Sequence, residues 1–520
     1  MKRLAKKFFI LAGAVSIVIL MSLVLHRLII TNLPDYQAEI EAWARQELGL
    51  TVQFTGLNAR FGILGPELIL QDARVSAMGD EENSILSARE VQLDVSALAL
   101  LMQRKLEISG LILQGTALAV ERAFDGNFRL QNIPENNSET TFLPEDVPPI
   151  EILIMDSSVT YEDQILGIAW RFQNVRAEFS KSLDGIALEA RADAPEELGG
   201  LVEVSAEVGL LDDQTESERN WRLFGEIRDF DLAVLPILVS EPKLSSVVGV
   251  GDIDVWLDMT GFHANQGTMQ LALTDVGLGN GEIADYDSFG LTAEWVSLEN
   301  GWTLSVNNLD LNRSGRSWPA NVSIDARVIN DEDGFRDIEL DTGFLQLEDI
   351  FPLLSVVTDS NWASVWEGFM PSGQLFEVDF SLGLGPDAQW DYSISSTFND
   401  IGISSNGLWP GLTNLSGDIR ADSRIGRLSI TSEDSLIESP TLFPERIQTS
   451  ELSGVIDWWQ GEDALRVASK DFIINTYDAR SETSLELIYP WDHSSPVLDL
   501  VSSIDDFNLN SMGTYLPKGV

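Results

Sequence analysis

Hydrophobic and polar residues alternate along most of the chain, and this alternation predicts β-strands. In Phe376–Leu384 every second residue is apolar, and the residues between them are Glu, Asp, Ser and Gly. A period of two places the two sets of side chains on opposite faces of a strand. Similar runs recur from residue 50 onwards, one of them covering Leu106–Val120, with Gly, Asn, Asp and Pro between them. The pattern therefore predicts an all-β fold built on an antiparallel sheet.

Helical spacing is confined to short segments. We expect an amphipathic helix within residues 31–49 and two further helices at Asp231–Val239 and Asp349–Phe369. So few helices cannot cover the apolar face of a long sheet, which must pair with a second sheet, close on itself or line a cavity. About 25 strands stacked at about 4.8 Å extend on the order of 100 Å, so the expected body is elongated.

The first 30 residues have the composition of a membrane anchor. Four Lys and Arg residues precede Phe8–Leu25, a stretch of 18 residues without a charge. As a helix this stretch spans roughly 27 Å, close to the hydrocarbon thickness of a bilayer. The basic end is expected to stay in the cytoplasm, with the rest exported. A cleaved signal peptide is the alternative, but no small-x-small site follows Leu25. The predicted anchor positions are Phe8, Leu11, Val15, Ile19 and Leu23.

One pattern recurs along the chain at nearly constant spacing. An Asp-hydrophobic strand end, a Pro-containing helical turn and a strand that begins with Gly run from Asp229 to Gly251 and again from Asp349 to Gly373. Such repeats build bodies in which each unit contacts its neighbours. A third start at Ile504 lacks the strand that should follow, which predicts an N-terminal fragment of a longer protein. Coincidence between Pro-broken loops of unrelated β domains is the alternative.

The predicted organisation follows from these segments. It has a basic leader and anchor at 1–30, an amphipathic helix at 31–49, a first β unit at 50–133, a loop at 134–149, a β unit at 150–240 and β repeats at 241–370 and 371–520, with the third repeat start truncated.

Composition narrows the classes of function. Among 520 residues, 33 Lys and Arg stand against 82 Asp and Glu, a net charge of −49, which excludes a nucleic-acid binder. The absence of Cys and the presence of 3 His exclude thiol nucleophiles and make a metal centre improbable. We find no nucleophile elbow, phosphate loop or complete calcium loop, so we expect no enzyme activity, cofactor or metal. The acidic residues belong largely to the solvent face of the sheet.

Several segments in a fixed order resemble the AsmA-like family, and in particular its YhdP branch. A basic leader and a short amphipathic helix are followed by a segment at 59–72 that looks like the first hairpin of the family. Residues 106–113 and Phe124–Phe128 resemble its next strand and Asp-Gly turn, and Asn406–Pro410 is similar to the YhdP branch. The resemblance implies a twisted, open β-groove with an apolar inner face. It also implies phospholipid movement between the inner and outer membranes of a Gram-negative cell, which supports the outer-membrane barrier.

Pattern alone favours a closed core and an open groove about equally, and the resemblance favours the groove. In that interpretation acyl chains lie on the apolar face, because each buried CH₂ contributes about 0.8 kcal/mol. The residues expected to line the groove are Val52, Phe54, Leu68, Leu70, Val91, Leu93, Val95, Ile152, Ile154, Val202, Val204, Ile253, Val255, Leu257, Leu271, Leu273, Val322, Ile324, Phe376, Val378, Phe380, Leu382, Leu384, Leu485 and Leu487.

The expected location is the inner membrane, with a single span and the body in the periplasm. The expected partners are membrane phospholipids, the inner membrane and, through the missing C-terminal part, the outer membrane or other envelope proteins. The alternative is an acidic adhesin or periplasmic scaffold of repeated β domains without lipid transport. An adhesin usually has near-identical compact units and a cleaved leader, and neither is evident in the sequence.

Overall fold

The structure is a computed structural model, and the following account covers the part of the chain that it describes. Of the predicted helix at 31–49 it describes Glu41, Ala42, Ala44 and Arg45, which are helical. The predicted anchor at 1–30 and nearly all of the predicted loop at 134–149 lie outside the described residues. Among those described, no helix has both the length and the apolar character needed to span a bilayer. The described residues are 41–42, 44–45, 50–61, 66–77, 84–95, 108–126, 128–130, 149–209, 219–239, 247–261, 263–278, 284–331, 334–357, 368–384, 390–407, 410–441, 443–492, 494–516 and 518.

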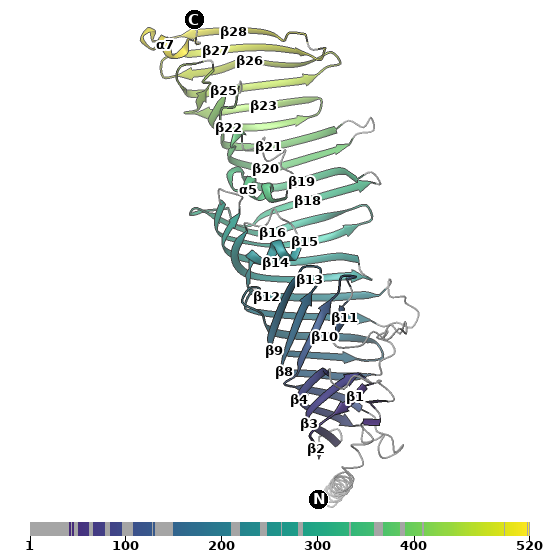
Figure 1. Cartoon of the computed structure of the whole chain (residues 1–520). Coiled ribbons are helices and arrows are strands. Elements are labelled where there is room, and N and C mark those ends of the chain that lie inside the picture. The colour runs from purple at the N-terminus through teal and green to yellow at the C-terminus, as the bar shows by residue number, and fades with distance from the viewer. Residues whose placement is uncertain are drawn as a thin grey trace, which may run out of the picture. The chain divides into compact units, whose positions relative to one another are not determined.

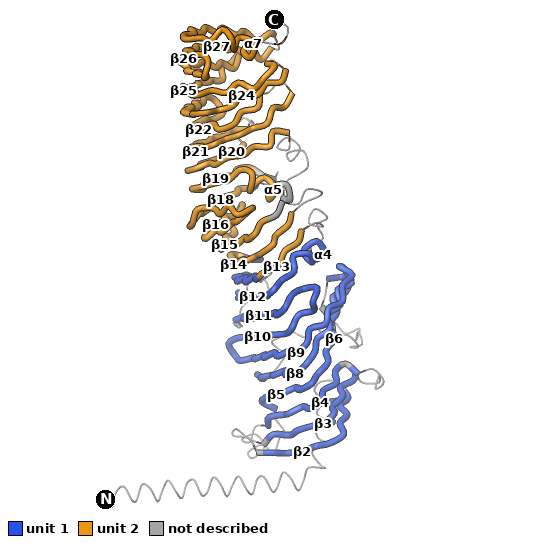
Figure 2. The backbone as a smooth tube through the Cα atoms, turned by 90° about the vertical axis from the view of Figure 1, so that its left-hand side faces the viewer, with its two compact units in different colours: residues 1–240, 252–264 blue, residues 241–251, 265–520 orange. Residues whose placement is uncertain are grey.

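The chain divides into two compact units, shown in different colours in Figure 2. Unit 1 contains residues 1–240 and 252–264, and unit 2 contains residues 241–251 and 265–520. Strands make up most of the described residues of both units, which confirms the predicted all-β class.

Unit 1 is a sheet of mostly antiparallel strands. β5 and β6 instead pair in parallel with β8, a departure from the antiparallel prediction. The predicted single run at Leu106–Val120 is broken between β5 and β6, where Gly115 has a φ of 65°. Its elements are β1 (Leu50–Gln53), β2 (Gly56–Phe61), β3 (Pro66–Ala77), β4 (Ser84–Val95), β5 (Ile108–Gln114), β6 (Ala117–Arg122), β7 (Phe128–Leu130), β8 (Ile150–Asp163), β9 (Ile168–Lys181), β10 (Gly185–Asp193), β11 (Leu201–Gly209), β12 (Asn220–Asp231), η3 (Leu232–Val234), α4 (Leu235–Val239) and most of β13 (Val248–Thr260).

Unit 2 is a ladder of antiparallel strands, most of which pair with their neighbours in the chain (Figure 1). The short strands β17 and β24 are exceptions, because β16 also pairs with β18 and β23 pairs with β25. Its elements are β14 (His263–Leu278), β15 (Ala284–Leu298), β16 (Gly301–Arg313), β17 (Arg316–Ser317), β18 (Val322–Asp331), β19 (Gly334–Gln346), α5 (Leu347–Val357), β20 (Ser372–Leu384), β21 (Trp390–Ile403), β22 (Gly411–Asp422), β23 (Ile425–Glu433), β24 (Leu436–Glu438), β25 (Ile447–Gln460), β26 (Ala464–Thr476), β27 (Arg480–Pro490), β28 (Val497–Asp505), η5 (Leu509–Ser511) and α7 (Met512–Tyr515).

Helical turns occur at the three places where the sequence repeat predicts them. η3 and α4 follow β12, α5 follows β19, and η5 and α7 follow β28. Two of these turns share their local geometry. Asp231 caps η3 by accepting from the Ala233 N–H, and Asn508 caps η5 by accepting from the Asn510 N–H. Asp229 and Asp506 lie two positions before these caps, and both have a left-handed backbone. The turn after β28 therefore repeats the turn after β12 in conformation as well as in sequence.

Candidate functional site

A continuous row of apolar residues crosses unit 2 from strand to strand. Directly paired residues on neighbouring strands project from the same face of a sheet, so the pairings identify which side chains lie in line. At about 4.8 Å per strand the row is about 50 Å long. From β15 to β28 it consists of Trp295, Leu304, Ala326, Leu340, Phe380, Ile394, Ala421, Gly426, Trp458, Val467, Leu487 and Leu498. We call the face that carries it the apolar face of unit 2.

The row beside it, on the opposite face, is polar. Its carboxylates and guanidinium groups pair across strands, as where Arg427 Nε lies 2.6 Å from Asp457 Oδ1. This hydrogen bond from Arg427 holds the pKa of Asp457 below its usual value. The row consists of Ser305, Asp325, Asp341, Asp379, Ser395, Arg420, Arg427, Asp457, Ala468, Glu486 and Asp499.

Unit 1 has the same arrangement. Charged residues such as Arg60, Glu67 and Glu207 fall on the opposite face, and Arg60 pairs there with Glu67. The apolar row consists of Ala59, Leu68, Leu93, Leu111, Ile152, Phe179, Leu188, Ala206 and Leu223.

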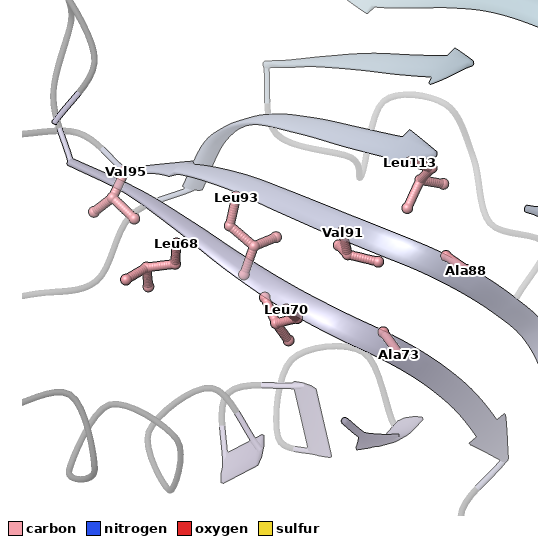
Figure 3. Close-up of a cluster of buried hydrophobic side chains, with 8 residues drawn as sticks. All are labelled: Leu68, Leu70, Ala73, Ala88, Val91, Leu93, Val95 and Leu113. Carbon is pink, nitrogen blue, oxygen red and sulfur yellow. The ribbon is translucent and has the colours of Figure 1, made fainter. Parts of the chain in front are cut away.

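The apolar face of unit 1 is most densely packed on β3, β4 and β5. Figure 3 shows the side chains of these strands pointing to the same side of the sheet. They form one buried cluster, against which Val52, Phe54 and Ile154 pack. Its members are Leu68, Leu70, Ala73, Ala88, Val91, Leu93, Val95 and Leu113.

The β13 segment of unit 1 continues the same two faces. Arg228 Nη2 of β12 lies 3.0 Å from Asp254 Oδ1. The ring centroids of Phe224 and Trp256 are 5.2 Å apart. Both contacts lie on the polar face. Alternation therefore places Ile253, Val255 and Leu257 on the apolar face.

Burial of the apolar face of unit 2 changes along the strands. α5 and α7 lie at one set of strand ends, which we call the helix rim. The turns after β22, β25 and β27 lie at the other set of strand ends, which we call the turn rim (Figure 1). Near the helix rim Leu311 is 0% exposed and Phe398 is 8% exposed. The residues of the row itself are mostly half-buried. At the turn rim Trp390 is 55% exposed and Tyr489 is 48% exposed, so the face is closed on one side and open on the other.

Left-handed residues account for the curl toward the helix rim. Asn308, Glu377 and Asp400 have φ values of 53°, 50° and 55°, and the strand register shifts at each of them. Such bulges bend a strand and increase its twist. Repetition of the bend on successive strands curves this end of the sheet. The same conformation occurs in other strands of unit 2, at Asp275, Asn414 and Asp471.

A buried carboxylate fastens α5 to the helix rim. Asp349 is 1% exposed and accepts hydrogen bonds from Trp318 Nε1 at 3.0 Å and from Arg313 at 3.4 Å. The Tyr286 hydroxyl donates to the backbone oxygen of Asp349 at 2.7 Å, and burial raises the pKa of Tyr286. These distant residues form one buried polar cluster, and their sequence spacing gave no sign of it.

Glu348 makes a second link between α5 and the sheet. Its carboxylate accepts from Arg316 at 2.7 Å and from the Gly373 N–H at 2.9 Å. Burial acts to raise the pKa of Glu348, but these hydrogen bonds together have the larger, opposite effect. The pKa of Glu348 therefore lies below its usual value. Gly373 has a φ of 107°, and a Cβ there would lie 2.4 Å from the Asp400 oxygen, so only glycine fits.

The predicted groove residues lie on the apolar face of their own unit, with the exception of Phe376, and they differ in exposure. Phe376 pairs with Thr397, which pairs with Asp418 on the opposite face, because the bulge at Glu377 interrupts the alternation of β20. Leu68, Leu70, Val91, Leu93, Val95, Leu273, Val322 and Val378 are buried, which makes them core rather than accessible surface. The remaining ones are half-buried, apart from the exposed Val204. These are Val52, Phe54, Ile152, Ile154, Val202, Ile253, Val255, Leu257, Leu271, Ile324, Phe376, Phe380, Leu382, Leu384, Leu485 and Leu487.

The prediction missed the aromatic residues of the turn rim. Trp390 and Tyr392 begin β21 opposite Leu384 and Leu382, which places them on the apolar face. Tyr489 of β27 pairs with Leu465 on the same face. Their position in alternating runs near turns was the available signal. The predicted anchor positions Phe8, Leu11, Val15, Ile19 and Leu23 lie outside the described residues.

Acidic pairs that resemble calcium motifs have structural partners. Asp231 caps η3, while Asp252 and Asp254 lie 3.6 and 3.0 Å from the guanidinium nitrogens of Arg228. Among the described residues no group of three or more His, Asp and Glu side chains is arranged to hold a metal ion.

Comparison with known proteins places the chain in a family. The family model described as YhdP protein matches residues 1–520. The chain belongs to the YhdP protein family. It is also similar to a protein of Escherichia coli (strain K12) named intermembrane phospholipid transporter YhdP, at 18% identity over 239 residues. That match covers 44% of this chain and 19% of the relative, so the chain spans about a fifth of the relative's length. No solved structure matches the chain.

Proposed function

We propose that this YhdP-family chain is part of a lipid conduit that carries phospholipids between the inner and outer membranes along its apolar faces. The observation that carries the proposal is the unbroken apolar row of unit 2, most of whose members are half-buried while most of their neighbours on the opposite face are charged. In a closed core these side chains would be buried. A long apolar surface open to one side is instead typical of a binding surface.

In this proposal the apolar row lowers the free-energy barrier to lipid movement and does not form a deep binding site. A phospholipid that leaves a bilayer exposes its acyl chains at a cost of about 0.8 kcal/mol per CH₂. The row offers the acyl chains similar apolar contacts about every 4.8 Å, in place of those that they had in the bilayer. The affinity for the lipid is therefore nearly equal at each position. The lipid then moves along the row without a large step in free energy, and its headgroup stays in water.

The setting that we propose is the bacterial envelope. An N-terminal span holds the chain in the inner membrane, the body lies in the periplasm, and the supply of lipid supports the outer-membrane barrier. The relative named as an intermembrane phospholipid transporter supports this setting. The proposed partners are phospholipids, the inner membrane and, through further parts of a longer protein, the outer membrane or other envelope proteins. Transport of this kind needs no enzyme chemistry or cofactor.

The proposal is tested by placing a charge in the row. We expect Ile394→Glu to reduce the phospholipid that copurifies with the chain several-fold, because a carboxylate among acyl chains loses its hydration. Lipid per chain is measured by extraction and mass spectrometry. Ser395→Glu is the matched control, since Ser395 is the next residue and projects from the opposite face. Equal lipid content in two variants with native circular dichroism contradicts the proposal.

A further inference from the structure

We propose that phospholipids lie across unit 2 with their headgroups at the turn rim and their acyl chains directed toward the helix rim, and that the turn rim favours headgroups bearing an amine. This inference rests on the proposed function, and it assigns an orientation and a substrate class to the same surface.

Aromatic residues mark the turn rim as a boundary between apolar and aqueous surroundings. Trp390, Tyr392 and Tyr489 project from the apolar face there and are exposed. Trp458 lies over Gly426, where a Cβ would be 2.1 Å from the indole. Indole and phenol groups combine an apolar ring with a polar atom, which is why they concentrate at the interface between hydrocarbon and headgroups in membranes. The same chemistry suits the glycerol and ester region of a phospholipid.

The helix rim lacks such a boundary on its apolar side. Leu311, Phe398 and Ile430 are buried there, and the polar atoms of Arg316 and Trp318 are bonded to α5. A headgroup at this rim would lose water without gaining free partners. Acyl chains meet apolar contacts in that direction.

The length of the open face fits one acyl chain. Trp390 and Ser396 of β21 are six residues apart, about 20 Å at the rise of a strand. One leaflet of a bilayer has about 15 Å of hydrocarbon, half of the total thickness. A chain anchored at Trp390 therefore reaches Ile394, about 13 Å along the strand, and ends before the buried Ser396.

The charge at the turn rim selects between headgroups. Among the described residues at and beside the turns after β22, β25 and β27, the carboxylates of Asp422, Glu462, Asp463 and Asp492 outnumber the guanidinium groups of Arg424 and Arg466, of which Arg466 lies 3.4 Å from Asp463. The side chain of Asp463 is 76% exposed. A negative rim repels a net anionic headgroup and attracts an exposed ammonium group.

The orientation is tested with phospholipids that carry a diazirine either on an ethanolamine headgroup or at the acyl terminus. The full chain is loaded with each probe and irradiated, and the labelled residues are mapped by mass spectrometry. We expect the headgroup probe to label Trp390, Tyr392 and Tyr489, and the acyl probe to label Ile394 and Leu428. The reversed pattern overturns the orientation but leaves the proposed function intact. Absence of labelling from both probes on the apolar face contradicts both.

Two further comparisons separate the aromatic and electrostatic contributions. We expect Trp390→Ala with Tyr489→Ala to reduce headgroup labelling several-fold at the remaining rim residues. Trp459→Ala is the control, because Trp459 is 38% exposed at the same strand ends but projects from the opposite face.

The electrostatic contribution is tested with two headgroups. The amine-bearing probe should label the turn rim several-fold more than a glycerol-headgroup probe with the same acyl chains. Asp463→Lys with Glu462→Lys should reduce that ratio. Equal labelling by the two headgroups contradicts the assigned substrate class, and an equal loss in the Trp459 variant contradicts the aromatic role.

Discussion

Left-handed Asp and Asn residues shape the sheet at the scale of single residues. Asp275, Asp400 and Asp471 occur within strands and have φ values of 53° to 55°. Asn and Asp tolerate this region better than other residues with a Cβ, because a short polar side chain bonds locally to the backbone. Each one bends its strand, so the curvature of unit 2 is encoded by a residue type that usually ends strands.

Asp275 offers a test of this conformational requirement. We expect Asp275→Asn to leave the opening free energy of β14 nearly unchanged, while Asp275→Val lowers it by about 1–2 kcal/mol, because a β-branched residue clashes at positive φ. Hydrogen exchange of the β14 and β15 amides measures this local opening.

Gln270 is the matched control for Asp275. It is exposed on the same strand without a positive φ, so Gln270→Val should be neutral or slightly stabilising there. An equal cost for both valine variants would show that the left-handed backbone is not the cause.

The helix after β19 fixes the helix rim at the scale of elements. Asp349 and Glu348 connect α5 to Trp318, Arg316 and Gly373, which belong to the β17 region and β20. Hydrogen bonds to charged groups stabilise more than neutral ones. Because Glu348 is partly exposed, its protonation is a controllable way to weaken this connection.

The link through Glu348 predicts a dependence on pH. Its pKa in the folded chain lies below the ordinary value of 4.5, so the stabilisation is complete above that value and is lost as the pH falls through the folded pKa. We expect the Gly373 amide to lose about 1–2 kcal/mol of protection on acidification in the native chain. Glu348→Gln should remove this dependence, measured by hydrogen exchange corrected for intrinsic rates.

Glu433→Gln serves as the reference for general effects of acid, since Glu433 is an exposed residue of unit 2 outside this cluster. If the native chain and Glu348→Gln lose Gly373 protection equally on acidification, the assigned link is wrong.

Strands and their faces followed from the alternation, whereas their curvature and burial did not. The alternation in Phe376–Leu384 predicted one apolar face, and the pairings of β20 place Val378, Phe380 and Leu382 on that face. The bulge at Glu377 places Phe376 on the opposite face, which the alternation did not predict. Several strands were not predicted as separate runs, among them β10, β22 and β26, because Ala, Gly, Arg and Lys at inward or mid-strand positions weaken the alternation. Bulges and the Asp349 cluster depend on contacts between distant residues, which a period of two does not encode.

At the scale of the whole molecule, two compact units repeat one design. Each has an apolar row that passes through directly paired residues, with charged residues on the opposite face. The net charge of −49 is therefore consistent with a wet outer surface, and the hydrophobic content of 44% supplies both a core and an accessible face. The function that we propose depends on the accessible part alone.

The most direct measurement of the central claim is photo-crosslinking from adjacent residues on the two faces. A photoreactive amino acid is introduced in cells at Phe380 or Val467, on the apolar face, and at Asp379 or Ala468, on the opposite face. Adducts are identified by mass spectrometry. We expect phospholipid adducts from Phe380 and Val467 and few from their neighbours. Adducts of equal yield from both faces, or from Asp379 and Ala468 alone, would contradict a lipid path on the apolar face.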